Sequence, residues 1–187
     1  MTRLAAMLFS LPLLFAAPAA TAQTVTTAAR MSPLLAARVA ALPDTLAGLL
    51  RDDGNDESGH PAPMVAYHSI NPQDPVITVV LADAKSPIPW PDMAENGRAG
   101  PRQAGLIDTL FEGKFSLDGH PKTRNFFGDY LTKQGIKQSW IADIDGVRVT
   151  ILATIYRAED RRKVFDAIRR DLLGGITMEK VSTAEAN

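Results

Sequence analysis

Hydrophobic and polar residues alternate most regularly in two segments near the C-terminal end, residues 136–144 and 147–156. A period of two along the chain is typical of strands with one buried face. The segments are separated by Asp145-Gly146, a dipeptide suited to a two-residue turn in which both residues have positive φ. The pattern therefore predicts a β-hairpin in which Trp140 lies opposite Ile151 on the apolar face.

Residues 64–83 predict a second hairpin. The segments 64–70 and 76–83 have the composition of strands, and turn formers occupy residues 71–75 between them. Apolar residues lie on both faces of segment 76–83. We therefore expect this strand to be central in the sheet and covered on each side.

Helical spacing of apolar residues indicates four helices. The first begins at Ser32-Pro33, which supply an N-cap and a first-turn proline, and it ends before Pro43. Two short helices are predicted around residues 103–111 and 125–134. The last helix covers residues 159–173, where apolar residues repeat on one side and two glycines follow.

Residues 45–51 fit two structures. Asp44 can cap a helical turn, whereas Leu46 and Leu50 alternate as they would on an edge strand. The pattern leaves both structures open. The following segment, residues 52–61, consists of turn formers and charged residues and predicts an exposed loop.

Residues 85–105 contain four prolines and three glycines and predict a long surface loop. Loops longer than about 12 to 15 residues without structure of their own are functional or disordered. Trp90, flanked by prolines, can anchor a ligand or partner, although it can also fold back over the sheet. We therefore predict a candidate binding loop. Its contact residues are Ile88, Trp90, Met93, Arg98 and Arg102.

The start of the chain is typical of a secretory signal peptide. Arg3 supplies the positive charge, residues 4–15 are apolar, and Ala20 and Ala22 form the cleavage site before Gln23. The apolar stretch is short and interrupted by proline, so we expect no membrane span after cleavage. Without a cysteine to carry a lipid or form a disulfide, the sequence predicts a periplasmic protein or, alternatively, a secreted one.

Strands that are mostly joined as hairpins, with helices gathered around them, indicate an α+β fold. We predict a single compact domain over residues 32–180, built on an antiparallel sheet with helices packed on its faces. The signal peptide accounts for residues 1–22. Flexible segments are expected at residues 23–31 and 181–187.

Composition narrows the possible partners. Of the 187 residues, 20 are Lys or Arg and 21 are Asp or Glu, which gives a net charge of −1. Nucleic-acid binding usually requires a basic surplus, so we expect no nucleic-acid partner. The chain has no cysteine, which excludes thiolate nucleophiles and Cys-ligated zinc.

Motifs for catalysis and metal binding are missing from the sequence. His60, His68 and His120 lack the spacing of a zinc site, and the acidic segment 52–61 departs from a calcium loop. No nucleophile elbow, phosphate loop or paired Ser-x-x-Lys motif occurs. We therefore predict no catalytic, cofactor-binding or metal-binding residues and no cofactor.

Six short runs along the chain carry a resemblance to known proteins: Leu42-Pro43, Leu46-Ala47-Gly48, Arg51, Tyr67, Leu81-Ala82-Asp83 and Ile88-Pro89. They resemble a group of exported bacterial proteins of uncharacterised role. The order of elements is also similar to that of the PsbP/Mog1/DcrB-like α/β sandwiches. The resemblance implies a strand within residues 45–51, a sheet with helices on its faces, and binding or assembly roles more often than catalysis.

These observations predict an exported, non-catalytic binding or accessory module whose partner is a periplasmic protein or a small ligand. The alternative is an enzyme of hydrolase type with an active site that no motif reveals. A flat apolar patch around Trp90 favours the binding module. A pocket with convergent polar groups favours the enzyme.

Overall fold

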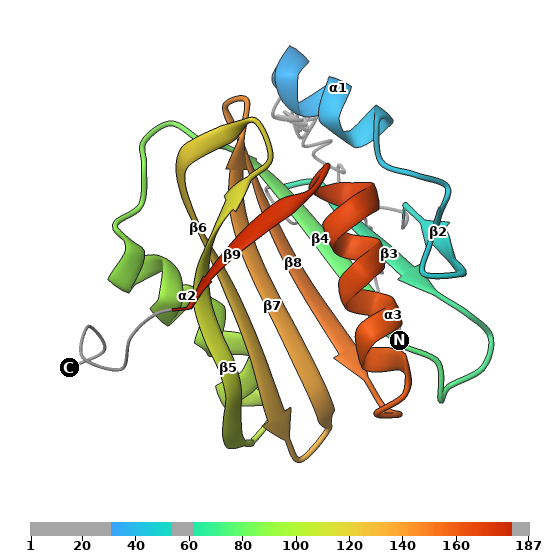
Figure 1. Ribbon diagram of the computed structural model, residues 1–187. Helices are drawn as coiled ribbons and strands as arrows, with labels where there is room; N and C mark the ends of the chain where they lie inside the picture. Colours follow the sequence, from blue (N-terminus) through green and yellow to red (C-terminus); the bar gives the residue numbers. More distant parts are fainter. Residues whose placement is uncertain (1–30, 54–61, 181–187) are drawn as a thin grey trace, which may run out of the picture.

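The computed structural model describes residues 31–53 and 62–180, without the side chains of residues 120–124 and 179–180 (Figure 1). The predicted signal peptide with its cleavage residues Ala20, Ala22 and Gln23 lies outside the described residues. The same holds for most of the acidic segment, including His60, and for the tail after residue 180.

Nine strands of the described chain form one sheet, in the order β1-β2-β3-β4-β8-β7-β6-β5-β9. Every neighbouring pair is antiparallel, which confirms the predicted antiparallel sheet. The strands are β1 (Thr45–Leu46), β2 (Leu49–Asp52), β3 (Met64–His68), β4 (Val76–Asp83), β5 (Leu106–Leu117), β6 (His120–Thr132), β7 (Gly135–Ile144), β8 (Val147–Ile155) and β9 (Ile176–Lys180).

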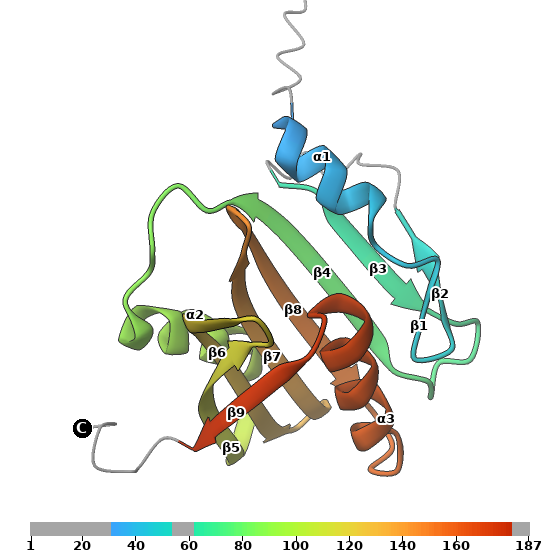
Figure 2. The same cartoon turned by 45° about the horizontal axis from the view of Figure 1, so that its top comes forward.

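Three α-helices accompany the sheet in the described residues: α1 (Pro33–Ala40), α2 (Trp90–Gln103) and α3 (Asp160–Ala167), the last extended by a π-helical turn, η1 (Ile168–Leu172). Figures 1 and 2 show α2 and α3 on opposite sides of the sheet. None of the helices described has the length and apolar character needed to cross a membrane.

Neighbouring residues of β6 contact different sides of the sheet, because successive side chains of a strand point to opposite faces. Phe126 packs with Met93 of α2. Phe127 packs with Phe165 of α3, and their ring centroids are 5.3 Å apart. The apolar cluster on the α3 side is the larger one and contains the fully buried Trp140.

The C-terminal hairpin is confirmed in the predicted register. Trp140 of β7 lies opposite Ile151 of β8. The turn residues Asp145 and Gly146 both have positive φ, of 49° and 82°. Trp140 is 0 % exposed, so the apolar face of the hairpin is the buried one.

The N-terminal part of the sheet also follows the predictions. Strands β3 and β4 form the expected hairpin, and β4 lies between β3 and β8, well inside the sheet. One face of β4 is buried and the other is half-buried, so the predicted covering of both faces is met only in part. Ser32 caps α1 by accepting a hydrogen bond from the Leu35 N–H at 3.2 Å. The ambiguous residues 45–51 form the β1–β2 hairpin around Ala47 and Gly48, both with positive φ.

The helices predicted at residues 103–111 and 125–134 are wrong. These residues mostly belong to β5 and β6, which form a long hairpin. Both faces of β6 are covered, so adjacent apolar residues hide the period of two that marks a half-buried strand. The β5–β6 connection is Asp118-Gly119, the same dipeptide that revealed the other hairpin.

The long loop predicted at residues 85–105 is also wrong, because α2 occupies most of it. Pro89 is the N-cap residue and Pro91 lies in the first turn, where a missing N–H costs no helical hydrogen bond. Gly97 allows close contact with the sheet, since a Cβ atom there would come within 2.0 Å of the Phe126 ring.

Candidate functional site

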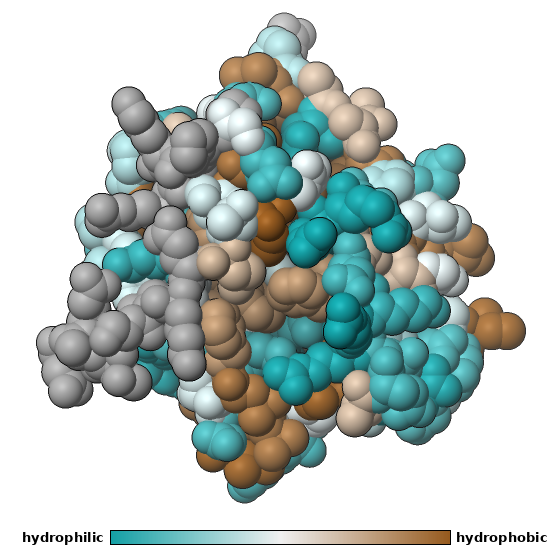
Figure 3. Space-filling view, in the orientation of Figure 1, coloured by the Kyte–Doolittle hydropathy of each residue, from teal (hydrophilic) through white to brown (hydrophobic). Residues whose placement is uncertain are grey.

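A cleft of about 670 Å³ opens between α3 and the neighbouring strands, and we call it the α3 cleft. Its strand side consists of Leu110 and Phe111 from β5, Phe127 and Asp129 from β6, Gln138 from β7 and Met178 from β9. Its helix side consists of Arg161, Arg162, Phe165 and Asp166 from α3, with Arg169 from η1 and Ala158 before α3. Figure 3 shows apolar side chains gathered between the hydrophilic side chains of this face of the molecule.

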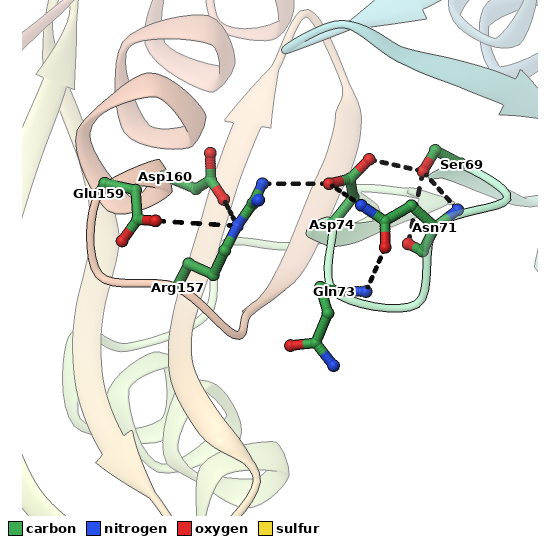
Figure 4. A network of polar contacts seen from close by, with 7 residues as sticks. All are labelled: Ser69, Asn71, Gln73, Asp74, Arg157, Glu159 and Asp160. Carbon is green, nitrogen blue, oxygen red and sulfur yellow. Dashed lines mark hydrogen bonds and ion pairs between the residues drawn. The ribbon is translucent and has the colours of Figure 1, made fainter.

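A polar network fixes the start of α3 against the sheet (Figure 4). Arg157 contacts Asp74 Oδ1 at 3.0 Å and donates to Asp160 Oδ2 at 2.8 Å. Asp74 also accepts hydrogen bonds from Ser69 Oγ at 2.7 Å and from Asn71 Nδ2 at 3.0 Å. The turn between β3 and β4 is therefore tied to the beginning of the helix that forms one wall of the cleft.

The floor of the α3 cleft is aromatic. The ring centroid of Phe127 lies 5.7 Å from that of Phe111 and 5.3 Å from that of Phe165. Trp140 packs beneath, with its centroid 4.0 Å from that of Phe127. Such rings offer a large apolar contact area with little conformational freedom to lose on binding.

Asp129 and Arg161 connect the two walls. Asp129 is 3 % exposed, and its Oδ2 atom accepts hydrogen bonds from Arg161 Nε at 2.7 Å and lies 2.6 Å from Nη2. Burial raises the pKa of Asp129, and the Arg161 guanidinium opposes that shift. The Gln138 side chain, opposite Asp129 in the neighbouring strand, also lowers the pKa of Asp129.

Two buried acceptors face this end of the cleft without partners. Asp129 Oδ1 and Gln138 Oε1 accept no hydrogen bond from the described residues. The two residues are direct neighbours across β6 and β7. The Nε2 atom of Gln138 is used, since it donates to the Arg161 carbonyl at 3.3 Å. A buried acceptor without a donor costs about 1 to 3 kcal/mol, so this pair of oxygens calls for a donor from outside the described residues.

The opposite end of the cleft is basic. Arg162 lies 3.6 Å from Asp166, a contact between exposed groups that is worth little. Arg169 forms no ion pair with any described residue. With Asp129 neutralised by Arg161, Arg169 is the one positive charge in the described lining of the cleft that has no ion pair with a described residue.

The structure places the predicted binding residues on the other side of the sheet, on and before α2. Ile88 and Trp90 pack at the edge of the smaller apolar cluster, and Met93 is buried in it. The Trp90 ring lies 6.3 Å from Phe126, centroid to centroid, and 4.9 Å from Lys114 Nζ. Much of the apolar area expected to meet a partner is therefore used inside the molecule.

The two arginines of that group are paired within the chain. Arg98 contacts both carboxylate oxygens of Glu112, at 2.7 and 2.5 Å, and Tyr130 donates to the same carboxylate at 2.6 Å. Arg102 pairs with Glu95. These contacts hold α2 on the sheet, and a binding role for the five residues stays a prediction.

Of the three histidines, His68 is the one whose side chain the structure describes. His68 lies on β3 and contacts Asp52 at 3.0 Å, and this hydrogen bond raises the pKa of His68. In residues 31–53 and 62–180, no three His, Asp or Glu residues are arranged to hold a metal ion.

One feature of the sequence, an isolated charged residue, could have indicated the cleft. Asp129 is a single charge in the apolar run from Phe126 to Leu131, and such a charge is rarely buried without a partner. Its partner, Arg161, is 32 residues further along the chain. Sequence pattern alone does not join positions that far apart.

Family models, curated proteins and solved structures were compared with this chain, and none matches it. The resemblance to PsbP/Mog1/DcrB-like proteins therefore stays a prediction.

Proposed function

We propose that this protein is an exported, non-catalytic binding module and that the α3 cleft takes a small ligand with an apolar body. The observation that carries the proposal is the pair of partnerless acceptors, Asp129 Oδ1 and Gln138 Oε1, at one end of an aromatic-floored cleft. Apolar walls with a few convergent polar groups are the usual chemistry of a small-molecule site.

Export rests on the N-terminal segment of the chain. Its positive start, apolar stretch and Ala20-x-Ala22 pattern support delivery to the periplasm, or secretion. A sheet carrying helices on its faces, similar to the PsbP/Mog1/DcrB-like architecture, is part of the same proposal. The arrangement of α2 and α3 on opposite sides supports it.

The alternative function, a hydrolase-type enzyme, is favoured by the presence of a pocket with convergent polar groups, the feature expected for an enzyme, and by one property of Asp129. Asp129 is a carboxyl group of raised pKa in a cleft with convergent polar groups, which is a common property of catalytic acids. However, the residues that line the α3 cleft include no Ser, Thr, His, Lys or Tyr, so the described walls offer no nucleophile apart from carboxylates. The cleft is therefore better suited to binding than to covalent catalysis.

The fluorescent probe anilinonaphthalene sulfonate tests this proposal, because it combines an aromatic body with an anionic group. We expect saturable binding to the wild-type protein and at least about tenfold weaker binding to Leu110→Glu, which places a charge in the apolar wall. Ile107→Glu is the matched control, since Ile107 is an exposed residue of the same strand outside the cleft lining.

Equal binding by wild type, Leu110→Glu and Ile107→Glu would contradict the proposal, and so would the absence of saturable binding. Circular dichroism of the three proteins checks that each remains folded.

A further inference from the structure

We propose that the ligand of the α3 cleft is an amphipathic anion that carries a hydroxyl group. The hydroxyl group lies at the inner end of the cleft, beside Asp129 and Gln138, and the anionic group lies at the outer end, beside Arg169. The inference rests on the proposed binding function and specifies the chemistry of the ligand. Three features of the cleft each define one part of the molecule: the partnerless acceptors, the aromatic floor and the unpaired arginine.

The inner end requires a hydrogen-bond donor. Asp129 Oδ1 and Gln138 Oε1 are both acceptors, and neither has a donor among the described residues. A carboxylate or carbonyl group of a ligand would add a further acceptor and leave the two oxygens unsatisfied. A donor group would satisfy at least one of them.

A neutral donor fits the inner end better than a cation. The Arg161 guanidinium already lies 2.6 Å from Asp129 Oδ2 and neutralises that carboxylate. An ammonium group placed at Oδ1 would face the guanidinium at short range and be repelled by it. A hydroxyl group donates one hydrogen bond without adding charge.

The outer end favours an anion. Arg169 has no ion pair among the described residues, and its neighbour in the cleft, Arg162, has only a 3.6 Å contact with Asp166. Guanidinium groups bind carboxylates and other oxyanions with paired hydrogen bonds. An anionic group at the mouth would therefore give Arg169 an ion-pair partner that the described residues do not provide.

The middle of the cleft requires an apolar body. Phe111, Phe127 and Phe165 present ring surfaces between the two polar ends. An aromatic ring of the ligand packs well against such surfaces in tilted or edge-to-face geometry.

Access to the inner acceptors depends on Arg161. Asp129 Oδ1 and Gln138 Oε1 are buried, whereas the Arg161 side chain is 41 % exposed. We expect binding to shift the exposed part of this long side chain while the guanidinium keeps its contact with Asp129 Oδ2.

Matched aromatic probes test the ligand class by isothermal titration calorimetry. We expect para-hydroxyphenylpropionate to bind about tenfold or more tightly than phenylpropionate, the effect of one well-placed hydrogen bond to a buried acceptor. Phenethylamine, which exchanges the carboxylate for an ammonium group, should bind more weakly than phenylpropionate.

Two variants locate the effects within the cleft. Gln138→Met, which removes an acceptor at similar volume, should reduce the ratio of the affinity for para-hydroxyphenylpropionate to the affinity for phenylpropionate. Arg169→Gln should weaken both anions equally. Lys163→Gln is the control for Arg169→Gln, because it also removes one positive charge, from a residue of α3 that does not line the α3 cleft.

The outcomes separate this inference from the proposed function. If the hydroxylated and plain probes bind with equal affinity, or if phenethylamine binds most tightly, the ligand class is wrong while a binding function stands. If none of the three probes binds and anilinonaphthalene sulfonate also fails, the proposed function and the ligand class are both overturned.

Discussion

At the scale of single residues, Asp129 is the position at which opposing effects meet. Burial disfavours its charged form, and Arg161 favours that form through contacts at 2.6 and 2.7 Å. The pKa of Asp129 is nevertheless raised, so burial is the larger effect. As an anion, Asp129 therefore contributes less to the stability of the folded protein than it does in its protonated form.

The pH dependence of stability tests this view of Asp129. A pKa that is higher in the folded than in the unfolded state means that stability falls as pH rises from the unfolded value, about 3.9, through the folded one. Relative to Asp129→Asn, which does not titrate, the wild-type protein should therefore become less stable between about pH 4 and pH 7. Denaturant melts of both proteins at the two pH values measure the difference. A wild type that gains on the variant as pH rises would show that Arg161 outweighs burial.

A second prediction at this scale concerns Trp140. The side chain is fully buried among the rings of Phe115, Phe127 and Phe165. Trp140→Ala should lower the free energy of unfolding by about 3 to 5 kcal/mol, because it empties a large aromatic site. Urea melts measure the change, with the exposed Tyr156→Ala as a control expected to stay within about 0.5 kcal/mol. A loss below about 1 kcal/mol for Trp140→Ala would contradict the observed burial.

At the scale of elements, the sequence predicts a hairpin correctly where the turn residues and the alternation of apolar residues indicate the same register. The β7–β8 hairpin was predictable because the Asp145-Gly146 turn and the alternation gave one register. The β5–β6 hairpin has the same kind of turn at Asp118-Gly119, but apolar residues on both faces of β6 remove the alternation. The prolines of residues 85–105 favour a loop when the sequence is considered alone, but Pro89 and Pro91 lie at the start of α2, where a helix tolerates proline.

The β7–β8 turn can be tested directly. Gly146 has a φ of 82°, and a Cβ atom there would meet only Leu34 Cδ1, at an ordinary 3.7 Å. Gly146→Ala should therefore cost about 1 to 2 kcal/mol through backbone strain alone. Asp145→Asn is the matched control, since Asn tolerates positive φ, and it should change stability by less than about 0.5 kcal/mol. Equal urea midpoints for Gly146→Ala and wild type would contradict the turn conformation.

At the scale of the whole molecule, the α3 cleft is a product of the tertiary fold. Phe111, Asp129, Gln138, Arg161 and Met178 come from five different elements that meet only because the strand order places β5 between β6 and β9. Each residue has an unremarkable sequence context, so no motif marks the site. The sequence could predict the antiparallel sheet, and it indicates export as a prediction. It could not predict which residues from distant parts of the chain come together to form the cleft.

Export to the periplasm is a prediction that concerns the whole chain. If residues 1–22 are a signal peptide, protein recovered from a periplasmic extract should have the intact mass of a chain that begins at Gln23. Mass spectrometry of the extract measures this. Recovery of the uncleaved chain in the membrane fraction would contradict export by this route.

The central claim is that a small amphipathic ligand binds in the α3 cleft. The most direct test is a titration of the isotopically labelled protein with para-hydroxyphenylpropionate, followed by amide chemical shifts in NMR spectra. We expect saturable shifts grouped at Phe127 and Asp129 of β6, Gln138 of β7, and Arg161 and Phe165 of α3. Saturable shifts confined to α2, around Trp90 and Arg98, or the absence of saturable shifts, would contradict the account.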